Sequence, residues 1–449
     1  MLEAWKARGG EAAVVGLGKS GLAAGLLLRD RGIPVYASDT GRSDAHERWA
    51  AELRAAGADV ELGGHDLPRI GRAMAVVVAP GVPPDVPPLE AALEAGVAVY
   101  AEAEIGLREL PATRYIAVTG TNGKTTTTSL IAHAMATAGL ASEAAGNIGT
   151  PVCAIARRST PPAWLALELS SFQLHDMPSV DPAVGVLTNL APNHLDRYRT
   201  LEEYYGDKAL LFRNADVASV WVSNADEAAV REMTAGIAGR HLRFSLQERS
   251  DGWFDRERRA LMLGARPVLP RDRLPLLGDH NVANALAALL ALDAAGLDAG
   301  AAAEALTTFR AIPHRVEPVR EVDGVLWIND SKSTNVTSTE VAIAALDRPF
   351  VLLLGGRHKG EPYTRLLPLL EGRCRAVVAY GESGDIVEAD LGGALRVVRA
   401  GTFDEVIAAA RREAKAGDAV LLSPACSSYD MFDNYEQRGE RFRAAVAAM

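Results

Sequence analysis

Cysteine is scarce in this chain, and no two cysteines are close together in the sequence. The 449 residues contain only Cys153, Cys374 and Cys426, with no CxxC pair. An odd number of widely spaced cysteines excludes a dense disulfide framework and fits a reducing compartment. We interpret all three as core or loop residues.

Long hydrophobic runs and an excess of positive charge are also missing. Residues 1–10 contain no apolar core of signal-peptide length, and Lys19 and Asp293 interrupt the long apolar stretches. Lysines and arginines number 47 against 57 acidic residues, a net charge of -10 that argues against a nucleic-acid-binding surface. We therefore expect a cytoplasmic monomer that binds small molecules and neither nucleic acid nor a membrane.

A glycine-rich loop follows the apolar run 115–118 and precedes a helical pattern at 125–139. Its spacing is Gly120-x-x-Gly123-Lys124-Thr125, with Val118 where the usual phosphate-loop pattern has its first glycine. Such glycines let backbone amides turn towards phosphate oxygens, the lysine neutralises charge, and the threonine hydroxyl can hold Mg²⁺. The loop predicts a bound triphosphate, against the alternative of a strand-to-helix turn with a solvated lysine.

A second glycine-rich turn lies nearer the N-terminus. Residues 16–21, Gly-Leu-Gly-Lys-Ser-Gly, separate a strand pattern from a helical one, and Asp39 ends the next strand near the spacing of a ribose-binding acid. This pattern predicts a nucleotide diphosphate. Tight packing of strand against helix is the alternative, and the motif does not separate NAD from another nucleotide.

Two apolar strands of the central part, at 163–169 and 183–190, end in polar residues. Because ligands bind at the carboxyl ends of parallel strands, Glu168 and residues 189–196 should converge on the phosphate loop. Glu168 and His194 are therefore candidate Mg²⁺ ligands. The alternatives are a capping or buried structural carboxylate for Glu168 and a loop or core histidine for His194.

Two helical patterns carry polar groups whose roles stay open. Lys208 shares a face of the pattern at 201–212 with apolar residues, a position from which lysine usually extends to water. Asn281 and Asn284 share a face near the start of an alanine-rich helix, where they could read a base edge or cap the helix.

Polar loops end the strands of the C-terminal part at residues 330–332, 355–360 and 423–428. They carry Lys332, Lys359 and several hydroxyl groups. Two ammonium groups suit a small substrate with two carboxylates, although each lysine alone could be merely solvated.

Strands alternate with helices along the whole chain, and 449 residues suffice for about three domains of ~150 residues. We predict an α/β protein of three domains, each a mostly parallel sheet flanked by helices. Their predicted ranges are 1–103 (Rossmann-like), 104–311 (a P-loop-type ATPase) and 312–449 (Rossmann-like).

Together these stretches resemble the Mur ligases, the amide-forming enzymes of peptidoglycan precursor synthesis, over essentially the entire chain. The matching stretches stand in the family's order and are 119–126, 146–149, 168–174, 188–190 with 194–196, 280–285, 313–315 and 329–332. Within the family, residues 16–21, 38–40, 423–432 and 436–439 resemble the members that add D-glutamate.

The resemblance implies an ATP-dependent ligase that joins UDP-N-acetylmuramoyl-L-alanine to D-glutamate through an acyl phosphate. It also implies two Mg²⁺ ions, with Thr125 and Glu168 at one and His194 with a carbamate on Lys208 (N6-carboxylysine) at the other. Lys124, His194 and Lys208 would be the catalytic residues.

The resemblance assigns ligand contacts to each domain. Implied ATP contacts are Gly120, Thr121, Asn122, Gly123, Lys124, Thr125, Thr126, Asn284, Arg315 and Asp330. In the first domain UDP takes the place of NAD, and the implied contacts to the UDP substrate are Gly18, Lys19, Ser20, Asp39, Thr40, Gly81, Asn147, Ser170 and Gln173. Implied D-glutamate contacts are Lys332, Thr334, Lys359, Ser428 and Tyr435.

The sequence departs from the family pattern at two places. Gly41 displaces Arg42 from the position just after Asp39 and Thr40, and Tyr435 stands where the aromatic residue is often phenylalanine. Two other functions compete with the ligase: an amide ligase of the folylpolyglutamate type, which residues 16–21 disfavour, and an NAD-dependent oxidoreductase with an accessory ATPase domain.

Overall fold

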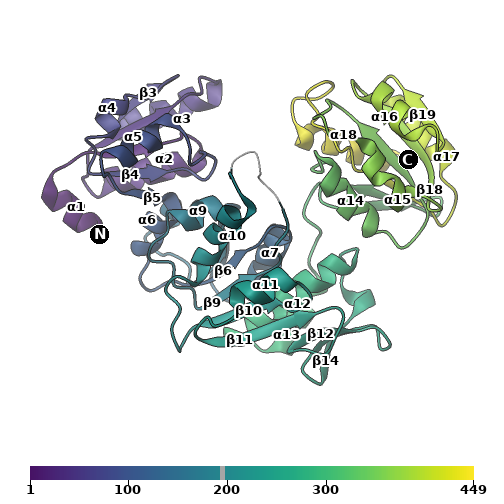
Figure 1. The fold of residues 1–449 in the computed structure, drawn as a ribbon, viewed down its shortest axis with the longest axis horizontal. Helices are drawn as coiled ribbons and strands as arrows, with labels where there is room; N and C mark the ends of the chain where they lie inside the picture. Colours follow the sequence, from purple (N-terminus) through teal and green to yellow (C-terminus); the bar gives the residue numbers. More distant parts are fainter. Residues whose placement is uncertain (193–197) are drawn as a thin grey trace. The chain divides into compact units, whose positions relative to one another are not determined.

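The computed structural model describes residues 1–192 and 198–449. Within these residues the chain forms three sheets, of five, nine and six strands (Figure 1). It divides into two compact units: unit 1 is Met1–Leu274 with Val282–Thr308, and unit 2 is Pro275–Asn281 with Phe309–Met449. Unit 1 contains the first two sheets, and unit 2 contains the third.

The first sheet of unit 1 is parallel, with the strand order β3-β2-β1-β4-β5. Its strands are β1 (Ala12–Val15), β2 (Val35–Asp39), β3 (Asp59–Leu62), β4 (Ala75–Val78) and β5 (Val99–Ala101). Its helices are α1 (Leu2–Arg8), α2 (Lys19–Asp30), α3 (Asp44–Ala55), α4 (Leu67–Ile70), α5 (Pro87–Glu94) and α6 (Glu102–Arg108). Strand order reverses between β1 and β4, which places a ligand crevice at their carboxyl ends.

The second sheet of unit 1 has the order β14-β13-β12-β11-β10-β9-β6-β8-β7. Its strands are β6 (Arg114–Thr119), β7 (Ser142–Gly146), β8 (Trp164–Glu168), β9 (Val184–Leu187), β10 (Val220–Asn224), β11 (Arg240–Ser245), β12 (Gly252–Asp255), β13 (Ala260–Leu263) and β14 (Arg266–Pro270). Pairs from β7 to β12 are parallel, and the last two pairs are antiparallel. The strand β6, which precedes the phosphate loop, is therefore an interior strand.

The helices that follow these strands are mostly short. They are α7 (Lys124–Thr137), α8 (Val152–Ala156), α9 (Ser171–His175), α10 (Leu201–Ala209), α11 (Ala228–Thr234), α12 (Asp279–Ala294) and α13 (Ala299–Leu306), with 3₁₀ turns η1 (Leu210–Phe212) and η2 (Arg271–Arg273). The division between the two units falls inside α12.

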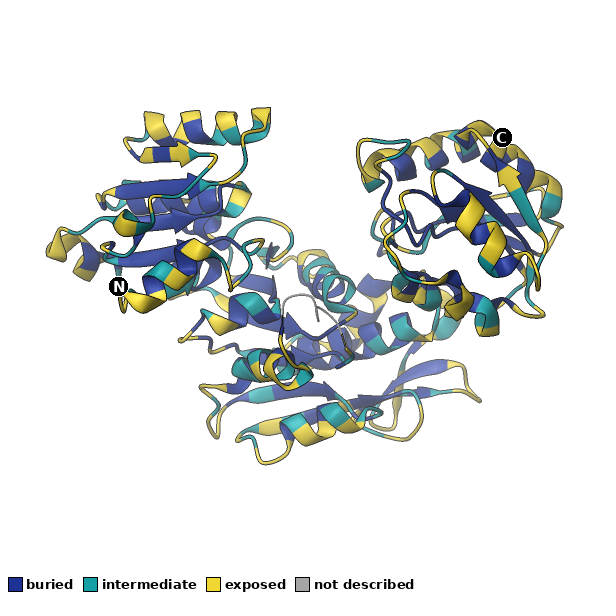
Figure 2. Cartoon of the chain, turned by 45° about the horizontal axis from the view of Figure 1, so that its top comes forward, coloured by how far each residue is buried: buried dark blue, intermediate teal, exposed yellow. Residues whose placement is uncertain are grey.

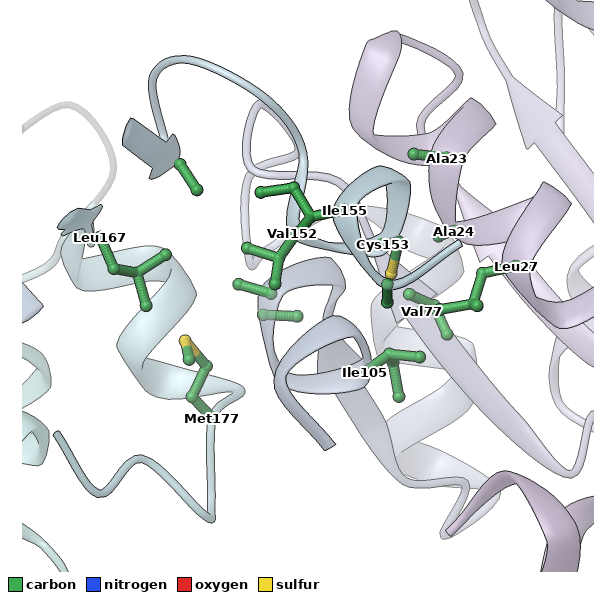
Figure 3. Close-up of a cluster of buried hydrophobic side chains, with 14 of the residues drawn as sticks. Ala23, Ala24, Leu27, Val77, Ile105, Val152, Cys153, Ile155, Leu167 and Met177 are labelled. Carbon is green, nitrogen blue, oxygen red and sulfur yellow. The ribbon is translucent and has the colours of Figure 1, made fainter. Parts of the chain in front are cut away.

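One apolar cluster joins the two sheets of unit 1 (Figure 3). Leu27 of α2, Ile105 of α6 and Ile155 of α8 all belong to it. Helix α6 approaches α8 so closely that a Cβ on Gly106 would lie 2.6 Å from the carbonyl carbon of Val152. This shared core explains why two separate sheets form a single compact unit.

Unit 2 contains a six-stranded sheet in the order β15-β16-β20-β17-β18-β19, in which only β15 is antiparallel. Its strands are β15 (Glu317–Val322), β16 (Val325–Asn329), β17 (Phe350–Gly355), β18 (Cys374–Tyr380), β19 (Val397–Ala400) and β20 (Ala419–Leu422). Its helices are α14 (Val336–Ala344), α15 (Leu367–Leu370), α16 (Gly384–Leu391), α17 (Phe403–Glu413) and α18 (Tyr435–Ala447), with the 3₁₀ turn η3 (Tyr363–Leu366).

Both faces of the unit 2 sheet are buried. Along β17, Leu352 and Leu354 enter one apolar cluster, and Val351 and Leu353 enter another. Figure 2 shows the strands as buried and the outer faces of the helices as exposed. A parallel sheet covered on both faces produces the continuous apolar runs seen in the sequence.

The predicted fold class is confirmed, because all three sheets are mostly parallel and flanked by helices. The predicted domain boundaries stay a prediction, since unit 1 contains the first two predicted domains together. None of the helices in the described ranges combines the length and apolar character needed to span a bilayer.

Gly106 should be sensitive to added volume. We expect Gly106→Ala to lower the free energy of unfolding by about 1–3 kcal/mol, because the new methyl group must push α6 away from the backbone of α8. Gly206 is a matched control, since it is also helical but its Cβ would meet open space. Gly206→Ala should stabilise the protein by about 0.5–1 kcal/mol. Urea denaturation of both variants measures the difference, and equal effects would contradict the packing argument.

Candidate functional site

The predicted phosphate loop joins β6 to α7. Gly123 has a φ of 80°, and α7 begins at the next residue, Lys124. A Cβ on Gly123 would also overlap the side-chain oxygen of Asn284 from α12, so both backbone conformation and space favour glycine. Thr127 donates to the same oxygen at 3.3 Å. Asn284, a predicted ATP contact, therefore lies against this loop, and Thr125 and Thr126 occupy the first turn of α7.

The segment after β9 also holds the loop. The amide of Asn122 donates to Asn189 Oδ1 at 2.8 Å, and Asn189 Nδ2 donates back to the Asn122 carbonyl at 2.9 Å. Thr188 donates to that carbonyl at 2.6 Å. Thr121 is held as well, because its hydroxyl donates to the Ala191 carbonyl at 3.1 Å. These contacts confirm the predicted convergence of this strand end on the loop.

Two lysines share one acceptor in the loop, the carbonyl oxygen of Gly120. Lys124 donates to it at 2.9 Å and also to the Thr121 carbonyl at 2.8 Å. Lys208 on α10 donates to it at 2.8 Å with its side chain 1% exposed. Lys208 thus lies at the loop and does not extend to water. Burial and the charge of Lys124 lower the pKa of Lys208 well below its usual value.

Glu168 is the last residue of β8, and only one of its two carboxylate oxygens accepts a hydrogen bond from a described residue. Its Oε1 accepts from Asn147 Nδ2 at 2.8 Å. Its Oε2 is buried and has no hydrogen-bond partner among the described residues. An unpartnered buried carboxylate oxygen is costly in a folded protein, and such an oxygen is a ligand that Mg²⁺ prefers. Glu168 therefore fits a Mg²⁺ ion, and Thr125, the other predicted ligand, stays a prediction.

His194, the other predicted metal ligand, lies outside the described residues. Within the described part of the chain, no three His, Cys, Asp or Glu side chains gather as a metal site.

A cavity of about 600 Å³ opens at the carboxyl ends of β1 and β4 in unit 1. Seven predicted contacts of the UDP substrate line it: Gly18, Lys19, Ser20, Asp39, Thr40, Gly81 and Asn147. Lining residues that sequence reasoning missed include His46, His65 and four prolines, Pro80, Pro83, Pro87 and Pro88. The proline-rich stretch was visible in the sequence, whereas nothing local marked either histidine.

Asp39, the last residue of β2, accepts a hydrogen bond from the glycine-rich turn and so holds the turn beside this strand. Its Oδ2 accepts from the Leu17 amide at 2.6 Å, and its Oδ1 accepts from the Gly41 amide at 2.6 Å. Nearby, His65 Nδ1 lies 2.8 Å from the Ser38 hydroxyl. Burial lowers the pKa of His65, which favours a neutral imidazole at this wall of the cavity.

Ser170 and Gln173, the two other predicted contacts of the UDP substrate, do not line this cavity. They form a capping box at the start of α9, in which Gln173 Oε1 accepts from the Ser170 amide at 3.0 Å. Gln173 Nε2 is buried and lacks a hydrogen-bond partner among the described residues. Gln173 faces a narrow crevice that shares Pro80 with the cavity.

The predicted D-glutamate residues lie in loops of unit 2, except for Tyr435, which begins α18. Lys332 Nζ lies 5.3 Å from the ring centre of Tyr435, and Lys359 Nζ lies 3.5 Å from the Thr334 hydroxyl. Ser428 is buried in the loop after β20. The preceding residue of that loop, Ser427, accepts from the amide of Arg357 at 2.9 Å, which joins it to the loop carrying Lys359.

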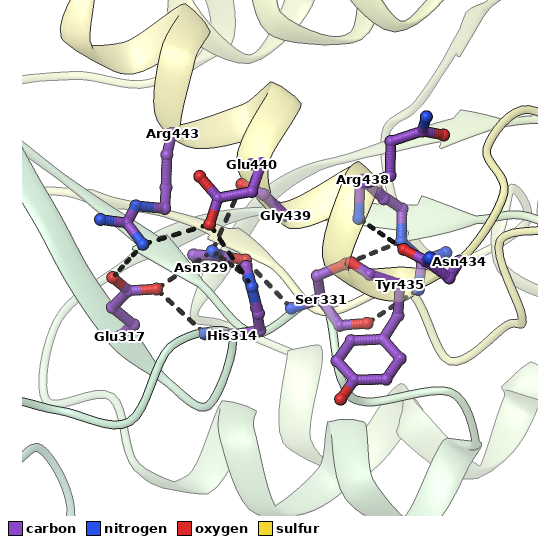
Figure 4. A network of polar contacts seen from close by, with 11 residues as sticks. His314, Glu317, Asn329, Ser331, Asn434, Tyr435, Arg438, Gly439, Glu440 and Arg443 are labelled. Atoms are coloured by element: carbon purple, nitrogen blue, oxygen red, sulfur yellow. Dashed lines mark hydrogen bonds and ion pairs between the residues drawn. The ribbon is translucent and has the colours of Figure 1, made fainter. Parts of the chain in front are cut away.

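Arg438 on α18 ties these loops together, as Figure 4 shows in part. It is fully buried, donates from Nε to the Ser331 hydroxyl at 2.9 Å and from Nη2 to the Ser331 carbonyl at 2.8 Å. It also donates from Nη1 to the Cys426 carbonyl at 3.2 Å. In the described part of the chain no carboxylate pairs with it. Arg438 lies in the stretch 436–439, which resembles ligases that add D-glutamate, but the sequence did not predict that its side chain holds these loops together.

Asp330 and Arg315, the predicted ATP contacts of unit 2, differ in exposure. Arg315 is exposed, whereas Asp330 is buried. Asp330 Oδ1 accepts from the Val316 amide at 3.1 Å, and Oδ2 accepts from the Ser423 hydroxyl at 2.8 Å. Burial raises the pKa of Asp330 to about 6, although hydrogen bonds and Arg315 act in the opposite direction.

Comparisons with known proteins cover the whole chain. Residues 10–101 match the family described as "Mur ligase MurD-like, N-terminal domain", residues 118–292 match "Mur ligase middle domain", and residues 314–426 match "Mur ligase, glutamate ligase domain".

Two curated relatives carry the name UDP-N-acetylmuramoylalanine--D-glutamate ligase. The protein from Acidobacterium capsulatum is 40% identical over 98% of this chain and 97% of its own, and that from Salinibacter ruber is 40% identical over 98% of both. The fold is similar to a crystal structure of UDP-N-acetylmuramate-alanine ligase from Thermotoga maritima, with a TM-score of 0.62 and 19% identity over 98% of this chain and 99% of that one.

Stability should depend on pH through Asp330. Because its folded-state pKa of about 6 lies above the usual 3.8, the stabilising proton is lost as pH rises through 6. Asp330→Asn removes this titration. The free energy of unfolding of the variant, minus that of wild type, should increase by about 3 kcal/mol between about pH 4 and pH 7. This is the energy equivalent of a pKa shift from 3.8 to about 6. Urea denaturation at each pH measures this, and a difference independent of pH would contradict it.

Proposed function

This chain belongs to the Mur ligase family, and we propose that it is an ATP-dependent ligase that joins D-glutamate to UDP-N-acetylmuramoyl-L-alanine in peptidoglycan precursor synthesis. The full-length match to two ligases of that name carries the proposal. A phosphate loop alone would fit many ATPases, but the matches to these relatives extend over 98% of the chain and so include the residues of the cavity of unit 1 and of the loops of unit 2.

The cavity at β1 and β4 is the proposed site of the UDP group. Helix α2 begins at Lys19 beside the cavity, so its first backbone amides and the lysine ammonium supply positive potential for a diphosphate. The proline-lined wall supplies a rigid apolar surface, because each proline ring fixes one backbone angle.

Activation of the alanyl carboxylate is the proposed first step. A carboxylate oxygen attacks the γ-phosphorus of ATP, the bond from that phosphorus to the β–γ bridging oxygen breaks, and ADP leaves an acyl phosphate behind. Lys124 brings positive charge to the phosphates from the loop at the start of α7. A Mg²⁺ ion held by Thr125 and Glu168 would supply further positive charge when bound.

Amide formation is the proposed second step. The neutral amine nitrogen of D-glutamate attacks the acyl carbon, the carbon–oxygen bond to phosphate breaks, and the nitrogen gives up one proton to the surrounding water as phosphate leaves. Lys332 and Lys359 supply two ammonium groups for the two carboxylates of D-glutamate. Thr334, Ser428 and Tyr435 complete the proposed contacts in the same group of loops.

Lys208 is the proposed site of a carbamate. Its burial and its lowered pKa favour a neutral amine, which can attack CO₂ to form a nitrogen–carbon bond and release a proton. The product would be an anion beside the Lys124 ammonium, because both side chains meet at the Gly120 carbonyl. With His194, it would hold the proposed second Mg²⁺ ion.

Loss of Lys124 should abolish turnover without loss of UDP binding. Wild type should release phosphate only with ATP, UDP-N-acetylmuramoyl-L-alanine and D-glutamate together, and L-glutamate should not replace the D-isomer. We expect Lys124→Ala to reduce the rate by at least about 10²-fold, because phosphate charge loses a fixed counter-charge. Lys415→Ala, at an exposed lysine, is the control. Phosphate release that is independent of the amino acid would refute the proposed function.

Lys208→Arg should be inactive, because arginine keeps a positive charge but cannot form the carbamate. After incubation with ¹³C-bicarbonate, wild type should show a carbamate carbon signal by NMR and the variant should not. Full activity of Lys208→Arg would end the carbamate proposal, whereas the Lys124 result would still stand.

A further inference from the structure

A buried tyrosine lies between two loops of unit 2, the one that carries Lys359 and the one that carries Ser428. Tyr363 begins the 3₁₀ turn η3 and is fully buried. Its hydroxyl oxygen lies 2.7 Å from Cys426 Sγ and 3.0 Å from His358 Nδ1. Cys426 belongs to the loop after β20, and His358 directly precedes Lys359 in the loop after β17. One hydroxyl group therefore contacts both loops.

The hydrogen bonds of this group are satisfied in both states of the imidazole. When His358 Nδ1 carries a proton, it donates to the Tyr363 hydroxyl, which donates to Cys426 Sγ, and the thiol can donate to the Ser383 hydroxyl at 3.5 Å. When Nδ1 is unprotonated, it accepts from the Tyr363 hydroxyl, which then accepts from the thiol. The rings of His358 and Tyr363 also pack together, with centroids 5.2 Å apart.

This side-chain link continues an attachment that the backbone begins. The Gly355 amide donates to the Pro424 carbonyl at 3.1 Å, and the Arg357 amide donates to the Ser427 carbonyl at 2.9 Å. These two bonds join the loops as far as Arg357. His358 is the next residue, so its contact with Tyr363 extends the attachment to the position beside Lys359.

Both partners of the link are held from a helix as well. The Tyr363 amide donates to Asp390 Oδ2 of α16 at 2.8 Å. The Cys426 carbonyl accepts from Arg438 Nη1 of α18 at 3.2 Å. The hydroxyl of Tyr363 thus bridges two positions that are themselves fixed, which is the arrangement needed to set the spacing of two loops.

We propose that Tyr363 and His358 are positioning residues for the amino acid. This inference rests on the proposed function, which assigns Lys359 and Ser428 to D-glutamate. By joining the two loops, Tyr363 and His358 keep the ammonium of Lys359 and the hydroxyl of Ser428 at a fixed spacing. Tyr363 acts through these residues and not by contact, because its own side chain is buried. A ligand of fixed size binds best to groups that are already spaced for it.

The first test is the steady-state kinetics of phosphate release by the full chain. Tyr363→Phe removes only the hydroxyl, so we expect the KM for D-glutamate to rise about ten-fold, with kcat and the KM for ATP changed by less than about two-fold. Tyr115→Phe is the matched control, because this buried tyrosine of unit 1 accepts from the Asp181 amide at 2.6 Å. It should lose stability but keep the wild-type KM. An unchanged KM in Tyr363→Phe, or an equal rise in the control, would overturn the inference.

Variants of Cys426 test the shared hydrogen bond. Cys426→Ala removes one partner of the Tyr363 hydroxyl, so combining it with Tyr363→Phe should raise the KM for D-glutamate no further than Tyr363→Phe alone. Cys426→Ser keeps a hydrogen-bonding group and should lie closer to wild type. Increases that multiply in the double variant would contradict a bond between the two side chains.

Amide hydrogen exchange without substrates separates this inference from the proposed function. Exchange at residues 357–360 should be faster in Tyr363→Phe than in wild type and unchanged in Tyr115→Phe. Exchange equal to that of wild type would overturn the inference even in an active ligase. If wild type did not use D-glutamate, the proposed function would fail and the role in binding this amino acid would fail with it, whereas faster exchange would still show the link between the loops.

Discussion

The carbonyl oxygen of Gly120 is the point at which two lysines of unit 1 are positioned at the phosphate loop. Lys124 reaches it from α7 and Lys208 reaches it from α10, so one acceptor orients two amines from separate helices. Two ammonium ions this close repel each other, and burial adds a further cost to the charged form of Lys208. The geometry therefore favours one charged and one neutral amine. The charged amine suits phosphate, and the neutral one is a nucleophile.

Local chemistry explains which features the sequence could predict. The phosphate loop is a continuous stretch in which the glycines, Lys124 and Thr125 follow one another, so its spacing alone predicts a phosphate-binding turn between a strand and a helix. The convergence of Glu168 and Asn189 followed from the rule that parallel strands end at one edge of a sheet. Lys208 was harder, because only the packed structure shows that its helix face turns towards Gly120.

Features that depend on long-range packing could not be predicted in the same way. His46 belongs to no motif, and only packing shows that it lines the cavity together with the glycine-rich turn, residues after β4 and Asn147. Arg438 was predicted only as part of a motif, yet its guanidinium joins the loop at Cys426, 12 residues away, to the loop at Ser331, 107 residues away. Ser170 and Gln173 stay predicted ligand contacts, and the structure adds that the same two residues form a helix cap.

The place of β20 in the unit 2 sheet has a consequence for synthesis on the ribosome. This strand pairs with both β16 and β17, although it is made after every other strand of the sheet. Until it emerges, two apolar strands present unpaired edges, which are templates for association with other chains. Pairing over such sequence separations is also slow. The sheet of unit 2, which would receive the amino acid under the proposed function, is thus completed only when its last strand has been made.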